Sequence, residues 1–197
     1  MNPESTLNNT NRTVSLTFDD GPHPVNTPKL LDELKAAGIR ATFFVVGKNL
    51  ETSAGKALVT RAIAEGHQVG NHTYSHADLT KLTEDQIRAE ITKTEALIGP
   101  AIGQHKLLRP PYGAHNSLVD KVVRELGYTI VLWNIDTLDW HPNYRQGPWV
   151  GHAMEQIEHR EHCVVLNHDI HATTVAKIDD LIGQIRNLPN TQFVQYS

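Results

Sequence analysis

The sequence predicts one α/β domain whose parallel sheet curls into a closed or nearly closed barrel. Short apolar runs alternate with longer amphipathic segments, glycines follow several of those segments, and no linker or change of composition divides the 197 residues. Alternation of this kind is typical of repeated βα units, which build parallel sheets. A chain of this length can also enclose one sizeable apolar core.

Seven short apolar runs predict the strands of this sheet. They cover residues 13–18, 41–47, 67–70, 105–109, 128–135, 163–168 and 191–196. In barrels built from βα units, functional residues lie at the C-terminal ends of the strands. The residues that directly follow each run are therefore the first candidates for a functional site.

Six amphipathic segments between the strands predict helices. They cover residues 27–37, 55–65, 84–98, 116–126, 147–160 and 173–186. Thr83 and Gln86 have the spacing of a capping box at the start of the third segment. Several of the segments are followed by glycine, which often ends a helix in a left-handed conformation. These glycines are Gly38, Gly66, Gly99 and Gly127.

Composition argues against several classes of protein. The formal net charge of -4 and the pI of about 6.3 speak against a nucleic-acid-binding protein, which normally carries an excess of basic residues. No apolar run is long enough to span a membrane. The single cysteine, Cys163, cannot form an intrachain disulfide, and its apolar neighbours predict a buried, inert thiol. We expect a monomer.

The first twelve residues, MNPESTLNNTNR, are polar and lack the apolar segment of a secretory signal peptide. We therefore expect a polar N-terminal leader over residues 1–12 and a single folded domain over residues 13–197.

Two adjacent carboxylates, Asp19 and Asp20, directly follow the first predicted strand. Like charges at a buried strand end repel each other and are costly to desolvate, so a compensating partner is expected. His72 and His76 follow the short third strand and are four residues apart, a spacing that places both imidazoles on one face of a helical turn. Two histidines and one carboxylate form a three-ligand metal site with a position open for water.

Three further groups of polar residues follow later strands. Arg109 ends the fourth predicted strand, Asp136, Asp139 and Trp140 follow the fifth, and His168 ends the sixth. Each residue also has an ordinary structural explanation, such as a surface arginine, a capping aspartate, a packing tryptophan or a structural histidine. Their common position at strand C-termini nevertheless indicates a shared site.

The five stretches TFDDGP, HTYSH, RPPY, DTLDW and LNH occur in this order between residues 17 and 168. Together they resemble the five motifs of the polysaccharide deacetylases, the NodB-like carbohydrate esterases of family four. The resemblance implies a single distorted (β/α)7 barrel, TIM-barrel-like, as the catalytic domain over residues 13–197. It also implies metal-dependent hydrolysis of N-acetyl groups, or in some members O-acetyl groups, on glycans.

The resemblance further implies roles for individual residues. Asp20, His72 and His76 would bind one divalent metal ion, with Zn2+ as the first choice and Co2+ or another divalent ion as alternatives. Asp19 would be the general base, and Arg109 would pair with it and tune it.

On the other side of the site, the same resemblance makes His168 the general acid, oriented by Asp139. The backbone N–H of Tyr112 would help to bind the oxyanion. Trp140 and Leu166 would line the pocket for the methyl end of the acetyl group.

These implications predict an enzyme that removes N-acetyl groups from glycans containing N-acetylglucosamine. Chitin oligosaccharides, poly-N-acetylglucosamine and peptidoglycan are all open as substrates. An acetylxylan esterase and a metal-dependent amidohydrolase acting on a small substrate are the alternatives within enzymes. A glycan-binding pseudoenzyme is expected to have lost a motif residue, and all of them are present.

The expected location is secreted, periplasmic or in the cell envelope, with the export signal outside this chain, and a cytoplasmic location stays open. Four aromatic residues lie in or near the predicted strand-end loops, where their rings can stack on sugar faces. They are Tyr74, Trp140, Tyr144 and Trp149.

Overall fold

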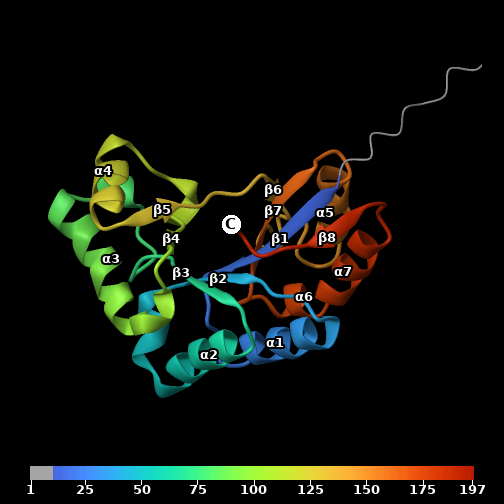
Figure 1. Cartoon of the computed structure of the whole chain (residues 1–197), viewed down its shortest axis with the longest axis horizontal. Helices are drawn as coiled ribbons and strands as arrows, with labels where there is room; N and C mark the ends of the chain where they lie inside the picture. The colour runs from blue at the N-terminus through green and yellow to red at the C-terminus, as the bar shows by residue number, and fades with distance from the viewer. Residues whose placement is uncertain (1–10) are drawn as a thin grey trace, which may run out of the picture.

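The computed structural model describes residues 11–197 and shows a parallel sheet surrounded by helices (Figure 1). The strands are β1 (Arg12–Asp19), β2 (Thr42–Val45), β3 (Gln68–Asn71), β4 (Lys106–Leu108), β5 (Tyr128–Ile130), β6 (Ile135–Asp136), β7 (His162–His168) and β8 (Thr191–Phe193). Their order in the sheet is β5-β4-β3-β2-β1-β7-β6, and β8 pairs separately with β1. The ladders are parallel, which confirms the predicted α/β architecture.

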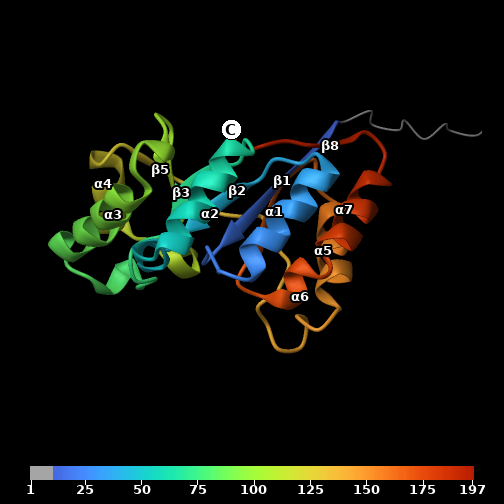
Figure 2. The same ribbon diagram turned by 90° about the horizontal axis from the view of Figure 1, so that it is seen from below.

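The helices pack around the outside of the sheet, with α3 and α4 at one end of the molecule and α5 and α7 at the other (Figures 1 and 2). They are α1 (Asn26–Ala37), α2 (Ser53–Ala64), α3 (Glu84–Ile98), α4 (Ser117–Glu125), α5 (Trp149–Ile157), α6 (Ala172–Val175) and α7 (Ile178–Arg186). Helix α3 begins and ends where the sequence predicts, and Thr83 and Gln86 form the predicted capping box at its start.

The expected single strand over 128–135 is wrong, because the structure has two short strands at opposite edges of the sheet. The N–H of Val131 still donates to the carbonyl oxygen of Leu108, the last residue of β4, whereas the N–H of Asn134 donates to Val164 in β7. Residues 131–134 therefore cross from one edge to the other, as the trace between β5 and β6 shows in Figure 1. The sheet is therefore a curled half-barrel whose edge strands β5 and β6 are joined by this crossing segment and not by a ladder.

The predicted helix over 173–186 is also divided, since α6 ends at Val175 and α7 starts at Ile178. The break allows the short α6 to turn its Thr174 hydroxyl onto Asp139, while α7 packs its apolar face into the core. The last predicted strand shortens to β8, beside the N-terminal half of β1. Residues 1–10 of the expected leader lie outside the described residues, and its last residue, Arg12, begins β1.

Strand β1 separates the apolar core from the polar barrel interior. Val14, Leu16 and Phe18 are buried in the apolar core cluster. Thr17 and Asp19 point to the opposite face, because successive side chains of a strand alternate. Both contact the guanidinium of Arg109, which is fully buried inside the barrel. The interior of the barrel near the C-terminal end of β1 therefore contains a buried, hydrogen-bonded group of polar and charged side chains.

Cys163 is 2% exposed in β7, and burial raises the pKa of its thiol, which confirms the prediction of an inert core cysteine. Within residues 11–197, no helix combines the length and the apolar composition needed to cross a bilayer.

Candidate active site

The C-terminal ends of several strands open into one pocket of about 450 Å³, a size that is typical of small-ligand sites. Parallel register brings these ends together: Asp19 stands opposite His168 in the β1–β7 ladder. Eight of the ten residues singled out from the sequence line the pocket: Asp19, Asp20, His72, His76, Tyr112, Trp140, Leu166 and His168. The other two, Arg109 and Asp139, are fully buried behind it.

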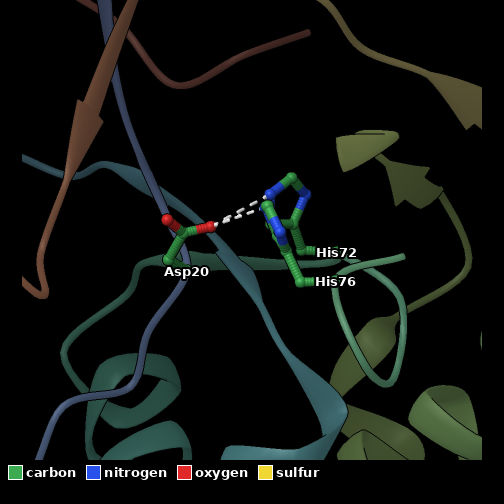
Figure 3. Close-up of side chains that lie close together, drawn as sticks. All are labelled: Asp20, His72 and His76. Atoms are coloured by element: carbon green, nitrogen blue, oxygen red, sulfur yellow. Dashed lines mark ion pairs between the residues drawn. The ribbon is translucent and has the colours of Figure 1, made fainter. Parts of the chain in front are cut away.

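Asp20, His72 and His76 form one compact cluster of metal-ligand type (Figure 3). The Oδ1 atom of Asp20 lies 3.3 Å from Nε2 of His72 and 3.1 Å from Nε2 of His76. In a tetrahedral zinc site with bonds of about 2.0–2.1 Å, neighbouring ligand atoms lie about 3.3 Å apart. The two distances from Asp20 therefore match this spacing, all three ligand atoms lie within 4.8 Å of one another, and the mixed N/O donor set suits a zinc-like ion.

The protonation of this cluster also suits a cation. The Nδ1 atom of His72 lies 2.6 Å from the carbonyl oxygen of Arg109, which can only accept, so Nδ1 donates and Nε2 is left for a metal. This outer hydrogen bond is typical of metal-binding histidines. Burial raises the pKa of Asp20, but the imidazoles of His72 and His76 outweigh that effect and hold the pKa well below its usual range. Asp20 is therefore anionic, as a metal ligand must be.

His72 and His76 do not share a helical turn, so this part of the prediction is wrong. His72 directly follows β3, and the loop after it has left-handed backbone at Thr73 (φ 68°) and His76 (φ 60°). The loop folds back on itself and brings the two imidazole centroids to within 5.0 Å. The four-residue spacing thus brings the ligands together through an irregular loop.

Asp19 and Arg109 form a buried ion pair beside the cluster. Oδ1 of Asp19 accepts from Nη1 of Arg109 at 2.9 Å, while Oδ2 lies 3.7 Å from Nε2 of His72. Arg109 is held in turn by the carbonyl oxygens of Val131 and Leu132, each at 3.1 Å. The crossing segment therefore fixes the arginine, which fixes the carboxylate with one oxygen facing the metal-ligand cluster.

His168 and Asp139 form a second pair across the pocket, in which Asp139 is fully buried and His168 is partly exposed. Nδ1 of His168 lies 2.7 Å from Oδ1 of Asp139, and Oδ2 of Asp139 accepts from the His168 N–H (2.8 Å) and the Thr174 hydroxyl (2.7 Å). Burial lowers the pKa of His168, but the hydrogen bond and charge of Asp139, with smaller contributions from Asp19 and Asp20, raise it to about 9. His168 is therefore an imidazolium at neutral pH.

The remaining wall of the pocket is largely aromatic. Tyr112 and Trp140 are 68% and 44% exposed, whereas Leu166 is buried at the base. The wall also contains Trp133 and Asp136. Sequence reasoning missed Trp133, which it placed inside a strand, and left Asp136 without a role. Trp133 lies three residues before the start of the DTLDW stretch, and this closeness to a motif was the sequence signal that could have identified it.

The expected sugar-stacking aromatics divide into two groups. Trp140 lies on the pocket, but Trp149 is fully buried in the core at the start of α5. Tyr144 packs against the core, and the ring of Tyr74 is covered by the ammonium of Lys93 at 3.3 Å. Tyr74, Tyr144 and Trp149 are therefore better explained as packing residues than as residues that stack on sugars.

A three-ligand cluster beside a carboxylate and a protonated histidine is typical of metal-dependent hydrolases. Residues 6–131 match the polysaccharide deacetylase family. The chain is 38% identical over 186 residues to a peptidoglycan-N-acetylglucosamine deacetylase of Listeria monocytogenes, covering 94% of this chain and 38% of that protein. This chain therefore belongs to the polysaccharide deacetylase family.

Two further comparisons agree. A peptidoglycan-N-acetylglucosamine deacetylase of Bacillus cereus is 46% identical over 128 residues, or 64% of this chain and 46% of that protein. The structure of a family 4 carbohydrate esterase from Streptomyces lividans, solved with acetate, is similar with a TM-score of 0.83 at 33% identity over 95% of this chain and 94% of that one. This chain spans less than half the length of the two curated relatives.

Proposed function

We propose that this chain is a metal-dependent deacetylase that hydrolyses the N-acetyl group of N-acetylglucosamine units in glycans. The observation that carries the proposal is the convergence of three groups on one pocket: a metal-ligand cluster, a carboxylate held by a buried arginine, and a histidine held by a buried aspartate. Family membership supports the same reaction class.

Asp20, His72 and His76 would hold the ion, with Zn2+ or Co2+ suited to their donor set. When bound, a divalent ion lowers the pKa of a water molecule toward neutrality and polarises the acetyl carbonyl. The remaining steps fall to side chains and backbone groups of the chain itself.

Asp19 would accept the proton of the attacking water. Its Oδ1 is engaged by Arg109, so the proton is expected on Oδ2, the oxygen that faces the cluster. Arg109 cannot take the proton away from the carboxylate, because a guanidinium has no acceptor. It would act by orienting Asp19.

His168 would protonate the departing amine. An amine is a poor leaving group unless it is protonated, and an imidazolium within reach of the pocket supplies that proton. Because Nδ1 is bound to Asp139, the proton would be transferred from Nε2. The presence of a general acid at His168 favours amide hydrolysis over ester hydrolysis, because the leaving group of an ester needs less help from an acid than an amine does.

The acetyl group would lie between the two catalytic pairs. Trp140 and Leu166 offer apolar surface for its methyl end, and both line the pocket. The resemblance to the family assigns the Tyr112 N–H to the developing oxyanion, and Tyr112 lines the pocket next to His76, with ring centroids 4.9 Å apart.

The charge of the pocket favours a neutral sugar. Among the described residues, its lining contains three aspartates and no lysine or arginine. Apart from His168 and the cation that the cluster would hold, both of which the reaction uses, the lactyl carboxylate of N-acetylmuramic acid would find no positive partner among these residues, whereas N-acetylglucosamine carries no charge and needs none. Relatives are named as peptidoglycan or chitin deacetylases, and action on such polymers would place this chain in the cell envelope or outside the cell.

An acetate-release assay tests the proposal. Purified protein loaded with Zn2+ is given N-acetylglucosamine oligomers, acetylxylan, an aryl acetate and free N-acetylglucosamine, and the products are identified by mass spectrometry. The proposal expects the oligomers to be the best amide substrates, because contacts to neighbouring sugars supply binding energy. Hydrolysis of acetylxylan alone would replace the proposal with an O-acetyl esterase. A monomer as good as a tetramer would favour a small-substrate amidohydrolase.

A further inference from the structure

The loop that carries the two histidine ligands is bound by a carboxylate from a distant helix. Oε2 of Glu90, in α3, accepts from the backbone N–H groups of Tyr74 (2.9 Å) and Ser75 (2.8 Å). Its Oε1 accepts from the Ser75 hydroxyl at 2.7 Å. One side chain thus receives three hydrogen bonds from the two residues midway between His72 and His76.

This loop needs support because its conformation is intrinsically unfavourable. Thr73 and His76 both have positive φ, and Thr73 is β-branched, a type of residue that rarely adopts this conformation. Without partners, the loop would spend part of its time in conformations that move His76 away from Asp20. The groups that bind Tyr74 and Ser75 therefore stabilise the loop conformation in which His76 lies close to Asp20.

The opposite side of the loop is held by backbone groups. The N–H groups of Gly47 and Lys48 donate to the carbonyl oxygens of Thr73 and Tyr74, both at 2.9 Å. On the side facing α3, Glu90 accepts the hydrogen bonds of the Tyr74 and Ser75 N–H groups. Since Glu90 acts through its side chain, its contribution can be removed without changing the backbone of the loop.

Helix α3 is a rigid support for this carboxylate. The side-chain amide of Asn71, next to His72, donates to the carbonyl of Ile91 at 2.9 Å, so the helix and the end of β3 are joined directly. Lys93 covers the ring of Tyr74 one turn further along. Helix α3 therefore contacts both the end of β3 and the middle of the ligand loop.

We propose that Glu90 is a positioning residue for the metal site: it holds the 72–76 loop in the conformation that binds the cation. The inference rests on the proposed metal site. If the binding-competent loop is only partly populated, the apparent dissociation constant rises by the inverse of that population. Loss of outer partners of metal ligands typically weakens metal binding about 10–100-fold.

The test is a Zn2+ titration by competition with a chromophoric chelator, on wild type and four variants. Glu90→Ala is expected to raise the dissociation constant by about 10–100-fold. Glu90→Gln keeps an oxygen for the two N–H groups and an amide that can donate to Ser75, so it is expected to retain most of the affinity. Ser75→Ala removes one of the three bonds and is expected to fall between wild type and Glu90→Ala.

Glu84→Ala is the matched control, because Glu84 lies on the same helix, pairs with Arg88 and Lys121, and does not contact the loop. Its Zn2+ affinity should stay within about twofold of wild type, a factor worth only a few tenths of a kcal/mol. The visible spectrum of the Co2+-loaded protein provides a second readout of ligand geometry, which should change in Glu90→Ala and not in Glu84→Ala.

Equal Zn2+ affinities for wild type and Glu90→Ala would overturn the role of Glu90 while leaving the metal site intact. An equal loss in Glu84→Ala would also overturn it, by attributing the effect to general destabilisation of α3. A wild-type chain without Zn2+ affinity would overturn the metal site and this inference together.

Discussion

The two sides of the pocket are built in different ways. On the metal side, Asp20 and His76 have left-handed backbone (φ 74° and 60°), and their side chains are 23% and 29% exposed. On the acid side, His168 ends a regular strand, and Asp139 is fully buried with three hydrogen bonds. Two of the three ligands on the metal side therefore have left-handed backbone, whereas the acid side joins a histidine at the end of a strand to a loop aspartate, next to left-handed Leu138, whose carboxylate is fully hydrogen-bonded.

The two sides are therefore expected to respond differently to mutation, metal removal and pH. Left-handed residues other than glycine cost about 1–3 kcal/mol each and persist only where neighbouring structure holds them. The metal side should accordingly depend on its ligand and its supporting hydrogen bonds. The acid side should depend on pH, because its function is one proton on one histidine.

Removal of the metal should have the largest effect and should act on the metal side alone. Exhaustive chelation, with residual metal checked by elemental analysis, is expected to abolish acetate release from N-acetylglucosamine oligomers, and Zn2+ or Co2+ should restore it. The far-ultraviolet circular dichroism should change little, because Asp139 and the strands do not depend on the ion. Undiminished activity in metal-free protein would contradict the proposed chemistry.

His168→Ala should impair the acid side selectively. Amide hydrolysis is expected to fall by about 10²–10⁴-fold, the usual contribution of a general acid. Hydrolysis of an activated aryl acetate should fall much less, since an aryl oxide leaves without a proton. Zn2+ affinity should be close to that of wild type. Equal losses on amide and ester would show that His168 serves structure or binding instead.

Asp139→Asn should shift the pH dependence. His168 acts in its protonated form, so kcat/KM should fall as pH rises through its pKa, which is raised to about 9. A bound cation opposes the contributions of Asp19 and Asp20, which places this limb at or below that value. Without the charge of Asp139 the pKa falls, and the basic limb should move down by about one unit or more. A basic limb at the same pH in wild type and variant would contradict this assignment.

Asp136→Ala should have the smallest effect. Oδ1 of Asp136 accepts from the Leu138 N–H (3.0 Å), at a left-handed residue, and from Nε1 of Trp140 (3.4 Å). Loss of these bonds should loosen the wall of the acetyl pocket, costing about 1 kcal/mol, or roughly fivefold in kcat/KM. Metal affinity and the pH profile should not move. A loss as large as that of His168→Ala would assign Asp136 a direct catalytic role.

Sequence predicted the fold best where local signals were strong. Helix α3 matches its predicted bounds because Thr83 and Gln86 mark its start through a local hydrogen-bond pair. The run 128–135 was misread because a hydrophobic stretch does not reveal that its pairing partner changes from β4 to β7. Such a change depends on where the sheet edges lie, which is a property of the whole barrel.

In the site, too, features with a local sequence signal were predicted, and features that depend on distant contacts were not. The motif residues line one pocket or lie directly behind it, because parallel strands bring their C-terminal ends together. The left-handed loop around His76 was not predictable, since its conformation is imposed by Gly47, Lys48 and Glu90 from elsewhere in the chain. Hydrogen bonds between segments this far apart have no periodic or spacing signal in the sequence.

The most direct test of the account compares Asp19→Asn with Asp20→Asn by Zn2+ titration and acetate release on the same preparations. Asp19→Asn is expected to bind Zn2+ nearly as well as wild type while turnover falls by about 10²–10⁴-fold, because the proton acceptor is lost. Asp20→Asn is expected to bind Zn2+ weakly and to regain part of its activity at high Zn2+ concentration. The opposite pattern, with Asp19→Asn losing the metal and Asp20→Asn keeping it, would contradict the division of work between the two neighbouring carboxylates.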